Sequence, residues 1–170
     1  VSRVHLNTDD FVEKVMELVE RYKIKHEYLE FELTESIFLD NTESAISTMH
    51  ELREKGFYVS IDDFGAGYSS LNLLKDMTTD VLKLDKEFFG GGDMKQEEKI
   101  IVSSITNMAK QLKMKVLSEG VETESQSKFL KEIDCDMAQG YLFAKPMPED
   151  EFTSLLQAKK IILEVKKDSQ

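Results

Sequence analysis

The chain has 170 residues, of which 41% are hydrophobic and 32% charged, a composition that suits one globular domain with its own core. Its 33 acidic residues against 22 lysines and arginines give a formal charge of −11, which argues against binding polymeric nucleic acid through its phosphates. The single cysteine, Cys135, excludes a disulfide framework and a thiolate zinc cluster, and no apolar run reaches membrane-spanning length.

In chain order, the hydrophobic pattern predicts strands and helices that alternate. We expect helices at 9–23, 42–55, 71–75, 97–112, 124–133 and 149–166. We expect strands at 28–34, 57–61, 81–84, 115–117 and 137–142, with a strand fragment at 1–6. Repeated strand-then-helix units favour a parallel sheet covered by helices.

Two architectures fit this alternation. An open doubly wound sheet suits five strands, whereas a (βα)8 barrel typically needs about 250 residues, so this chain would be an incomplete barrel. The chain begins at Val1 without a methionine and directly in strand-like sequence, as expected of a piece cut from a longer protein.

The most specific segment follows the second predicted strand and reads Asp-Asp-Phe-Gly-Ala-Gly-Tyr-Ser-Ser-Leu from position 62. Successive side chains of a strand point to opposite faces, so Asp62 and Asp63 cannot both be ordinary solvent-exposed residues on one face. Gly65 and Gly67 allow a tight turn close to a ligand, and Ser69 can cap the helix that follows. An Asp pair alone is more often a turn or cap signal, but the ten-residue string is far more specific.

Polar side chains gather at the carboxyl ends of the predicted strands, where α/β proteins bind their ligands. Acids so placed could not all ionise around one lysine without a compensating charge. Divalent cations are the natural compensation, and oxygen-only ligands favour Mg²⁺ or Mn²⁺. The residues are Glu32, Asp62, Asp63, Lys83, Asp85, Glu119, Glu122 and Gln139.

Five motifs closely resemble those of the EAL domain family, the cyclic di-GMP phosphodiesterases. They are Glu32-Leu33-Thr34-Glu35, Asp62-Asp63-Phe64-Gly65-Ala66-Gly67-Tyr68-Ser69-Ser70, Lys83-Leu84-Asp85, Glu119-Gly120-Val121-Glu122-Thr123 and Gln139-Gly140-Tyr141-Leu142-Phe143. The match covers 1–152 as a partial EAL domain and leaves 153–170 as a C-terminal helix and charged tail. Within the motifs, Ala66 replaces the usual Thr and Ser118 the usual Ala.

The resemblance implies a (βα)8 TIM-type barrel that hydrolyses cyclic di-GMP, a bacterial second messenger of biofilm and motility control, to the linear dinucleotide. The Glu-Ala-Leu motif that names the family is absent from the chain. Its Glu and a family Asn, both metal ligands, are expected upstream of Val1. We therefore expect about strands 3 to 8 of the barrel, and a fragment that is inactive by itself.

The resemblance also implies a two-metal mechanism, in which a metal pair lowers the pKa of bound water and clamps the attacking and leaving oxygens. Glu32 and Asp62 would bind the first metal, with Asp62 bridging to the second, which Asp63 would help to hold.

Three further residues are predicted to be catalytic. Glu119 would be the general base or a ligand of the second metal, and the sequence leaves those two roles open. Lys83 would orient the hydroxide or neutralise charge that develops on the phosphorane. Asp85 would tune Lys83 or the water network.

The remaining site residues have structural alternatives. Glu35 resembles the family residue that anchors the loop after Asp63, a loop implicated in dimerisation and activation, but it could be a helix cap. Glu122 and Gln139 resemble groups that orient the substrate. Glu122 could instead be a solvated acid at a helix start, and Gln139 a hydrogen bonder at the barrel rim.

Two other functions compete with the phosphodiesterase. One is a non-catalytic cyclic di-GMP receptor, and the other is a different metal-dependent barrel enzyme such as an enolase-like lyase. We expect a homodimer through the loop after Asp63, and fused sensory or GGDEF domains in the parent protein. A cytoplasmic location is expected, with any membrane tether carried by segments outside the chain.

Overall fold

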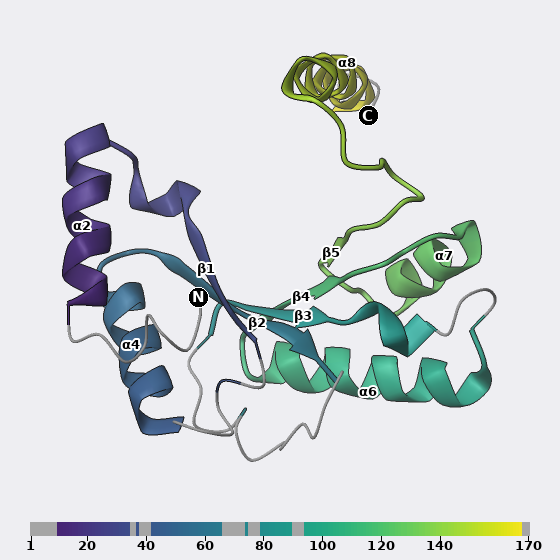
Figure 1. Ribbon diagram of the computed structural model, residues 1–170. Coiled ribbons are helices and arrows are strands. Elements are labelled where there is room, and N and C mark those ends of the chain that lie inside the picture. The colour runs from purple at the N-terminus through teal and green to yellow at the C-terminus, as the bar shows by residue number, and fades with distance from the viewer. Residues whose placement is uncertain are drawn as a thin grey trace.

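The computed structural model describes residues 10–34, 37, 42–65, 74, 79–89 and 94–167 of the chain. Its centre is one sheet of five parallel strands whose spatial order follows the chain. A doubly wound sheet would reverse its strand order at a switch point, whereas a barrel adds each new strand beside the last. The fold is therefore α/β with the topology of a barrel arc (Figure 1). The strands are β1 (Glu30–Thr34), β2 (Tyr58–Phe64), β3 (Val81–Leu84), β4 (Lys115–Ser118) and β5 (Met137–Ala138).

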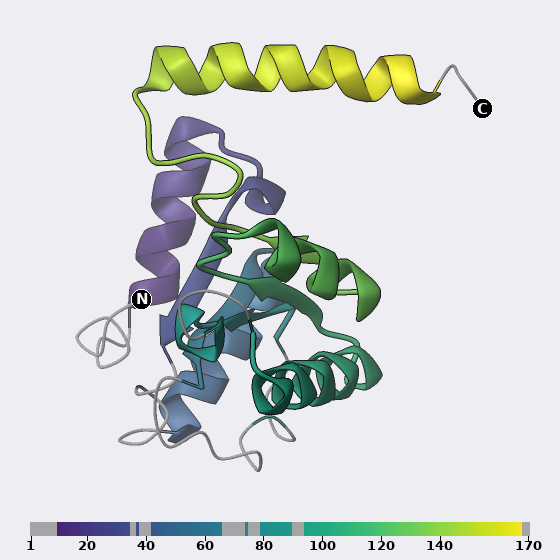
Figure 2. The ribbon, with the colours of Figure 1, turned by 90° about the vertical axis from the view of Figure 1, so that its right-hand side faces the viewer.

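The helices mostly follow the strands, as the alternation predicts, and Figure 1 shows α4 and α6 on the same side of the sheet. Figures 1 and 2 both show α8 set apart from the sheet, beyond the segment that follows β5. No helix among the described residues has the length and apolar character needed to cross a membrane. The helices are α2 (Phe11–Tyr22), α4 (Thr42–Glu54), α6 (Gln96–Gln111), α7 (Glu124–Glu132) and α8 (Glu149–Lys167), with 3-10 turns η1 (His26–Tyr28) and η2 (Lys86–Phe89).

The core lies between the sheet and the covering helices. Each apolar side chain that is fully removed from water there contributes about 1.5–3 kcal/mol to folding. The fully buried strand residues are Leu33, Val59, Ile61, Leu82, Leu84 and Val116. Their helical counterparts are Ala45, Met49, Leu52, Val102 and Ala109. This packing fixes the strands and so fixes the positions of the polar residues at their carboxyl ends.

The amino-terminal edge of the sheet is held by aspartates that bond the neighbouring strand. Asp80, just before β3, accepts the Val59 N–H of β2 at 3.0 Å, and Arg53 Nη2 donates to its Oδ1 at 2.9 Å. Asp136, just before β5, likewise accepts the Val116 N–H of β4 at 2.9 Å. An aspartate that accepts a backbone N–H of the neighbouring strand thus links β2 to β3 and β4 to β5.

Three strand predictions differ by more than one residue in their bounds, and β4 ends one residue later than expected, at Ser118. The first strand begins at Glu30 rather than 28, because η1 turns the chain and the Leu29 N–H bonds His26 O at 3.0 Å. β2 runs on to Phe64, past the expected end at 61. β5 is only Met137–Ala138, since the chain then turns and the Phe143 N–H bonds Gly140 O at 3.1 Å.

Two predicted elements lie outside the described residues, the strand fragment at 1–6 and all but one residue of the helix at 71–75. The other predicted helices agree with the observed ones to within two residues at each end.

Candidate metal centre

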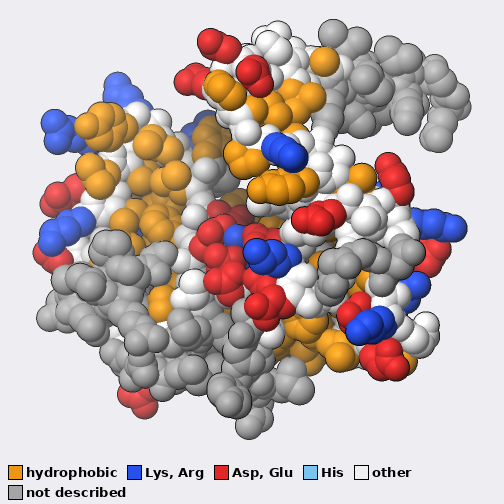
Figure 3. All heavy atoms as spheres, turned by 45° about the vertical axis from the view of Figure 1, so that its right-hand side comes forward, with side chains coloured by type: hydrophobic (Ala, Val, Ile, Leu, Met, Phe, Trp, Pro, Cys, Tyr) orange, Lys and Arg blue, Asp and Glu red, His pale blue; other side chains and the backbone are white. Residues whose placement is uncertain are grey.

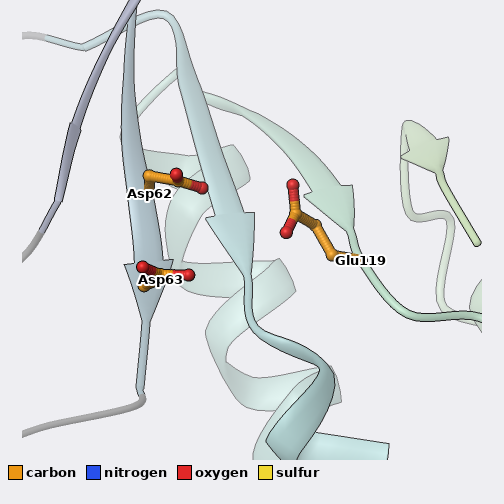
Figure 4. Close-up of side chains that lie close together, drawn as sticks. All are labelled: Asp62, Asp63 and Glu119. Carbon is orange, nitrogen blue, oxygen red and sulfur yellow. The ribbon is translucent and has the colours of Figure 1, made fainter. Parts of the chain in front are cut away.

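Asp62 and Asp63 both reach the same site because the end of β2 is irregular. In a regular strand two consecutive side chains point to opposite faces. Here the pairing of β2 with β3 shifts register between Ile61 and Phe64, and Asp63 has a left-handed backbone with φ of 56°. A bulge of this kind re-aims a side chain. The two carboxylates and that of Glu119 consequently offer ligand atoms that all lie within 4.8 Å of one another (Figure 4).

Lys83 lies at the centre of the acids. The lysine residue is only 6% exposed, and its Nζ donates a hydrogen bond to Glu32 Oε1 at 2.7 Å. The same Nζ lies 2.8 Å from Asp62 Oδ1 and 2.9 Å from Glu119 Oε1. Burial alone lowers the pKa of Lys83, but the bonds to Asp62, Glu32 and Glu119 outweigh it and raise that pKa above its usual value. Lys83 is therefore a permanently charged cation.

Asp63 carries the least favourable charge of the cluster. Its pKa is raised above the usual 3.8, first by partial burial and then by the nearby charges of Asp62, Asp85 and Glu119. A hydrogen bond with the Asp85 side chain raises it further. Asp85 itself accepts the Glu87 N–H at 2.7 Å, so it is held in place by η2.

The cluster fits a hard divalent cation on its own geometry. Asp62 Oδ1 is buried and faces the Lys83 ammonium group at 2.8 Å. The three carboxylates of Asp62, Asp63 and Glu119 converge with one lysine for compensation, and the pKa of Asp63 is raised above its usual value by burial and by the neighbouring charges. Oxygen donors in this number suit magnesium or manganese better than zinc.

The predicted residue Glu32 has a different position from the other acids. Its side chain is 47% exposed, and it is not among the carboxylates that converge within 4.8 Å. Glu32 contacts the cluster through Lys83 instead.

Glu122 and Gln139 are exposed at the ends of β4 and β5. The Glu122 N–H donates to Gln126 Oε1 at 2.8 Å, so Glu122 stands at the capped start of α7. The Gln139 N–H donates to Ser118 O at 2.8 Å, which ties the rim of the sheet together. The predicted loop residues Glu35, Gly67 and Ser69 lie outside the described residues, and Gly65 lies within them.

Sequence reasoning missed the turn η2, which contacts both sides of the cluster. Its Phe88 lies against Gly65 and its Lys86 against Gly120. The signal was present in the sequence, because Gly65 follows Asp63 by two residues and Gly120 directly follows Glu119. A glycine beside a functional acid is typical of a close approach by another segment.

The surface agrees with the local geometry. Figure 3 shows acidic side chains gathered in the middle of one face, with lysine or arginine among them and apolar side chains alongside. Such a mixed surface can hold a polar ligand whose bases or rings contact the apolar part.

Comparison with known proteins gives consistent matches. The family model described as EAL domain matches residues 1–146. The chain is 38% identical over 154 residues to cyclic di-GMP phosphodiesterase NbdA of Pseudomonas aeruginosa, covering 91% of this chain and 20% of NbdA. It is 35% identical over 140 residues to the bifunctional diguanylate cyclase/cyclic di-GMP phosphodiesterase MucR of the same organism, covering 82% and 20%. The chain thus spans about a fifth of the length of these curated relatives.

Solved structures are similar over most of the chain. PaMucR phosphodiesterase in its c-di-GMP complex superposes with a TM-score of 0.81 at 33% identity, covering 89% of this chain and 62% of that one. The EAL domain of Mycobacterium smegmatis DcpA gives a TM-score of 0.85 at 35% identity, covering 93% and 71%.

Proposed function

The chain belongs to the EAL domain family, and we propose on that premise that the protein carrying it hydrolyses cyclic di-GMP to the linear dinucleotide. The family prediction from five motifs and the prediction of a TIM-type α/β barrel are both confirmed. NbdA is named a phosphodiesterase of this compound, and the PaMucR structure contains it. The observation that carries the proposal is the convergence of Asp62, Asp63 and Glu119 beside Lys83.

We propose Mg²⁺ or Mn²⁺ as the cation, held by Asp62, Asp63 and Glu119. When bound, such an ion lowers the pKa of a water molecule and stabilises negative charge on phosphoryl oxygens. Carboxylates bind it only when ionised, so the raised pKa of Asp63 makes cation binding favour higher pH. The convergence of Glu119 with both aspartates favours the ligand role over the role of a free general base.

Lys83 acts as a fixed positive charge rather than as a base. Its pKa lies above the usual value, because the ammonium group bonds Asp62, Glu32 and Glu119, and this favours its charged form near neutral pH. Contacts of 2.7 to 2.9 Å to Glu32, Asp62 and Glu119 fix its ammonium group in space. A preorganised charge of this kind stabilises the charge that builds up on a phosphate during substitution.

Other residues have supporting roles in the proposal. Asp85 contacts Asp63, which favours the orientation of Asp63 over the tuning of Lys83. Glu122 and Gln139, exposed at the strand ends, are proposed to orient the dinucleotide. Glu35 is proposed to anchor the loop that contains Gly67 and Ser69.

The surroundings of the domain are also part of the proposal. We propose an EAL unit over 1–152, which includes the first turn of α8, followed by the rest of that helix and a charged tail over 153–170. Dimerisation through the loop after Asp63 is proposed, as is fusion to further signalling domains, which is supported by the bifunctional description of MucR. A cytoplasmic site of action fits a second-messenger substrate.

The test is cyclic di-GMP hydrolysis by the full-length protein with Mn²⁺ or Mg²⁺, beside Glu119→Gln. A matched control is Glu87→Gln, which neutralises an exposed acid of η2. Linear product from the unaltered protein and from Glu87→Gln, but not from Glu119→Gln, supports the proposal. Binding of cyclic di-GMP without any product would favour the receptor function instead.

A further inference from the structure

The acids of the metal centre come from strands that do not touch each other. Asp62 and Asp63 belong to β2 and Glu119 follows β4, with β3 between them (Figure 4). The separation of these carboxylates therefore depends on what packs between the ends of β2 and β4. That position is taken by η2, the turn that follows β3.

On the β2 side, η2 packs against Gly65. The glycine has φ of +97°, a left-handed conformation that side chains rarely adopt. A Cβ atom at this position would overlap the ring of Phe88. The Phe88 ring thus occupies the space of the missing side chain, and it packs against the core behind the cluster. Because Gly65 is two residues from Asp63, Phe88 limits where the end of β2 can lie.

On the β4 side, η2 packs against Gly120, whose φ is +67°. A Cβ atom there would overlap Lys86 Cβ, and Lys86 Cα would be only 3.2 Å away. The contact is made by the base of the lysine side chain and its backbone, not by its flexible end. The preceding Glu119 donates its N–H to Leu84 O of β3 at 3.0 Å, so the start of this loop is fixed on β3.

The turn is held rigidly between these contacts. Asp85 Oδ1 accepts the Glu87 N–H at 2.7 Å, and the Phe88 N–H bonds Asp85 O at 3.2 Å. The Asp85 N–H in turn reaches Phe64 O of β2 at 3.4 Å. Because this turn is hydrogen-bonded and packs against both flanks, a shift of the end of β2 would also move the end of β4.

We propose that η2 is a spacer that sets the separation between the aspartates of β2 and Glu119, and that Phe88 and Lys86 are positioning residues of the cation site. The inference rests on the proposed function for the identity of the site, but it concerns the chain's own packing. Neighbours that orient metal ligands typically change metal affinity by about 10- to 100-fold when they are mutated.

Each variant of the first pair removes one phenyl ring, which is partly buried at Phe88 and buried at Phe129. Phe88→Ala deletes the contact with Gly65, and the control Phe129→Ala deletes a buried phenylalanine of α7. Mn²⁺ is titrated into the full-length protein by calorimetry, and amide hydrogen exchange at Glu119 is measured without metal. We expect Phe88→Ala to weaken Mn²⁺ binding about 10-fold and to speed exchange at Glu119, with Phe129→Ala changing neither by more than about 2-fold.

The second pair tests the other side of the spacer. Gly120→Ala and Gly56→Ala both place a side chain at positive φ, but Gly56 has only ordinary contacts, with His26 at 3.8 Å. Backbone strain is therefore similar, and only Gly120→Ala pushes against η2. We expect weaker Mn²⁺ binding from Gly120→Ala alone. Phe88→Ala could fail to fold, in which case Phe88→Leu, which keeps part of the contact, replaces it. The spacer role is then judged from Phe88→Leu and from the two glycine variants.

Equal Mn²⁺ affinity within both pairs would overturn the spacer. If the unaltered full-length protein binds no Mn²⁺, the cation of the proposed function fails, and exchange at Glu119 alone decides the spacer. Faster exchange in Phe88→Ala and Gly120→Ala than in their controls would then support it, and equal exchange would refute it.

Discussion

The two edges of the sheet differ in how their carboxylates are paired with cationic side chains. At the amino-terminal edge, Arg53 Nε and Nη2 donate to the Asp80 carboxylate at 3.1 and 2.9 Å, and Asp80 also accepts a backbone N–H. At the carboxyl edge, Lys83 faces three carboxylates, and Asp63 adds a fourth with a raised pKa. The first edge pairs its charges, whereas the second leaves an excess of negative charge.

The backbone is regular at the amino edge of the sheet and irregular at the carboxyl edge. Asp80 and Asp136 each bond an N–H of the strand before them, which strengthens regular pairing. The carboxyl edge has a register shift in β2, and Asp63 has a left-handed backbone. Strained backbone and unsatisfied groups typically collect at functional sites and are stabilised by the rest of the fold. The comparison indicates that the amino edge maintains regular strand pairing, whereas the carboxyl edge gathers the acids of the proposed cation site.

The largest expected effect is at Asp63. Asp63→Asn removes one carboxylate of the cluster, and Asn tolerates the same left-handed backbone. We expect hydrolysis of cyclic di-GMP by the full-length protein to fall about a thousandfold, equivalent to about 4 kcal/mol of transition-state stabilisation, while the metal-free protein becomes slightly more stable. Steady-state kinetics and urea unfolding in a chelator measure the two effects. A variant that keeps full activity would contradict this account of the carboxyl edge.

Lys83→Met should give the largest loss of stability. It leaves Glu32, Asp62 and Glu119 without their cation, which costs about 3 kcal/mol when partly buried charges lose their partner. Urea unfolding without metal measures the loss, and Mn²⁺ should restore part of it. The control Lys128→Met removes an exposed pair with Glu132 and should cost less than about 0.5 kcal/mol. Equal losses from both variants would show that the cluster does not depend on Lys83.

Asp80→Ala should weaken the fold without affecting the metal centre. Arg53 and the Val59 N–H lose their acceptor, which costs about 2 kcal/mol. Asp136→Ala, which frees one N–H of Val116, should cost about 1 kcal/mol. Urea unfolding gives both values, and calorimetry should give unchanged Mn²⁺ affinity. A large change in that affinity would mean that the two edges are not independent.

The smallest expected effect is a pH dependence at Asp63. Its pKa is raised from the usual 3.8, so the folded chain binds this proton more tightly than the unfolded chain does. The resulting stabilisation is complete below pH 3.8 and is lost as the pH rises through the raised pKa. Without metal, the stability advantage of Asp63→Asn should therefore grow across that window. A difference in unfolding free energy that stays constant with pH would contradict the raised pKa.

Much of the fold follows from local pattern. Alternating strand and helix periodicity predicts the elements around β2, β3 and β4, because their buried residues are nearly continuous apolar runs. β5 was predicted four residues too long, since the apolar residues Tyr141 and Leu142 read as a strand although the chain turns there. Hydrophobic pattern alone does not distinguish a short strand from a packed turn.

The site was predictable in its membership but not in its geometry. Asp62, Asp63, Lys83 and Glu119 all end strands of one parallel sheet, so the sequence places them at one edge. The irregularity that turns Asp63 toward the site depends on tertiary packing and has no local signature. The exposure of Glu32 and the packing of Phe88 behind the cluster likewise depend on contacts between distant segments.

The cation site at the carboxyl edge is tested most directly by thermal unfolding of the full-length protein and of its Asp63→Asn variant, each with and without Mn²⁺. An ion that binds only the folded state stabilises it by about 2.7 kcal/mol at 100 times its dissociation constant. We expect Mn²⁺ to raise the Tm of the unaltered full-length protein by several degrees and to leave that of Asp63→Asn nearly unchanged. An equal rise in both, or no rise in the unaltered full-length protein, would contradict a cation site at the carboxyl edge.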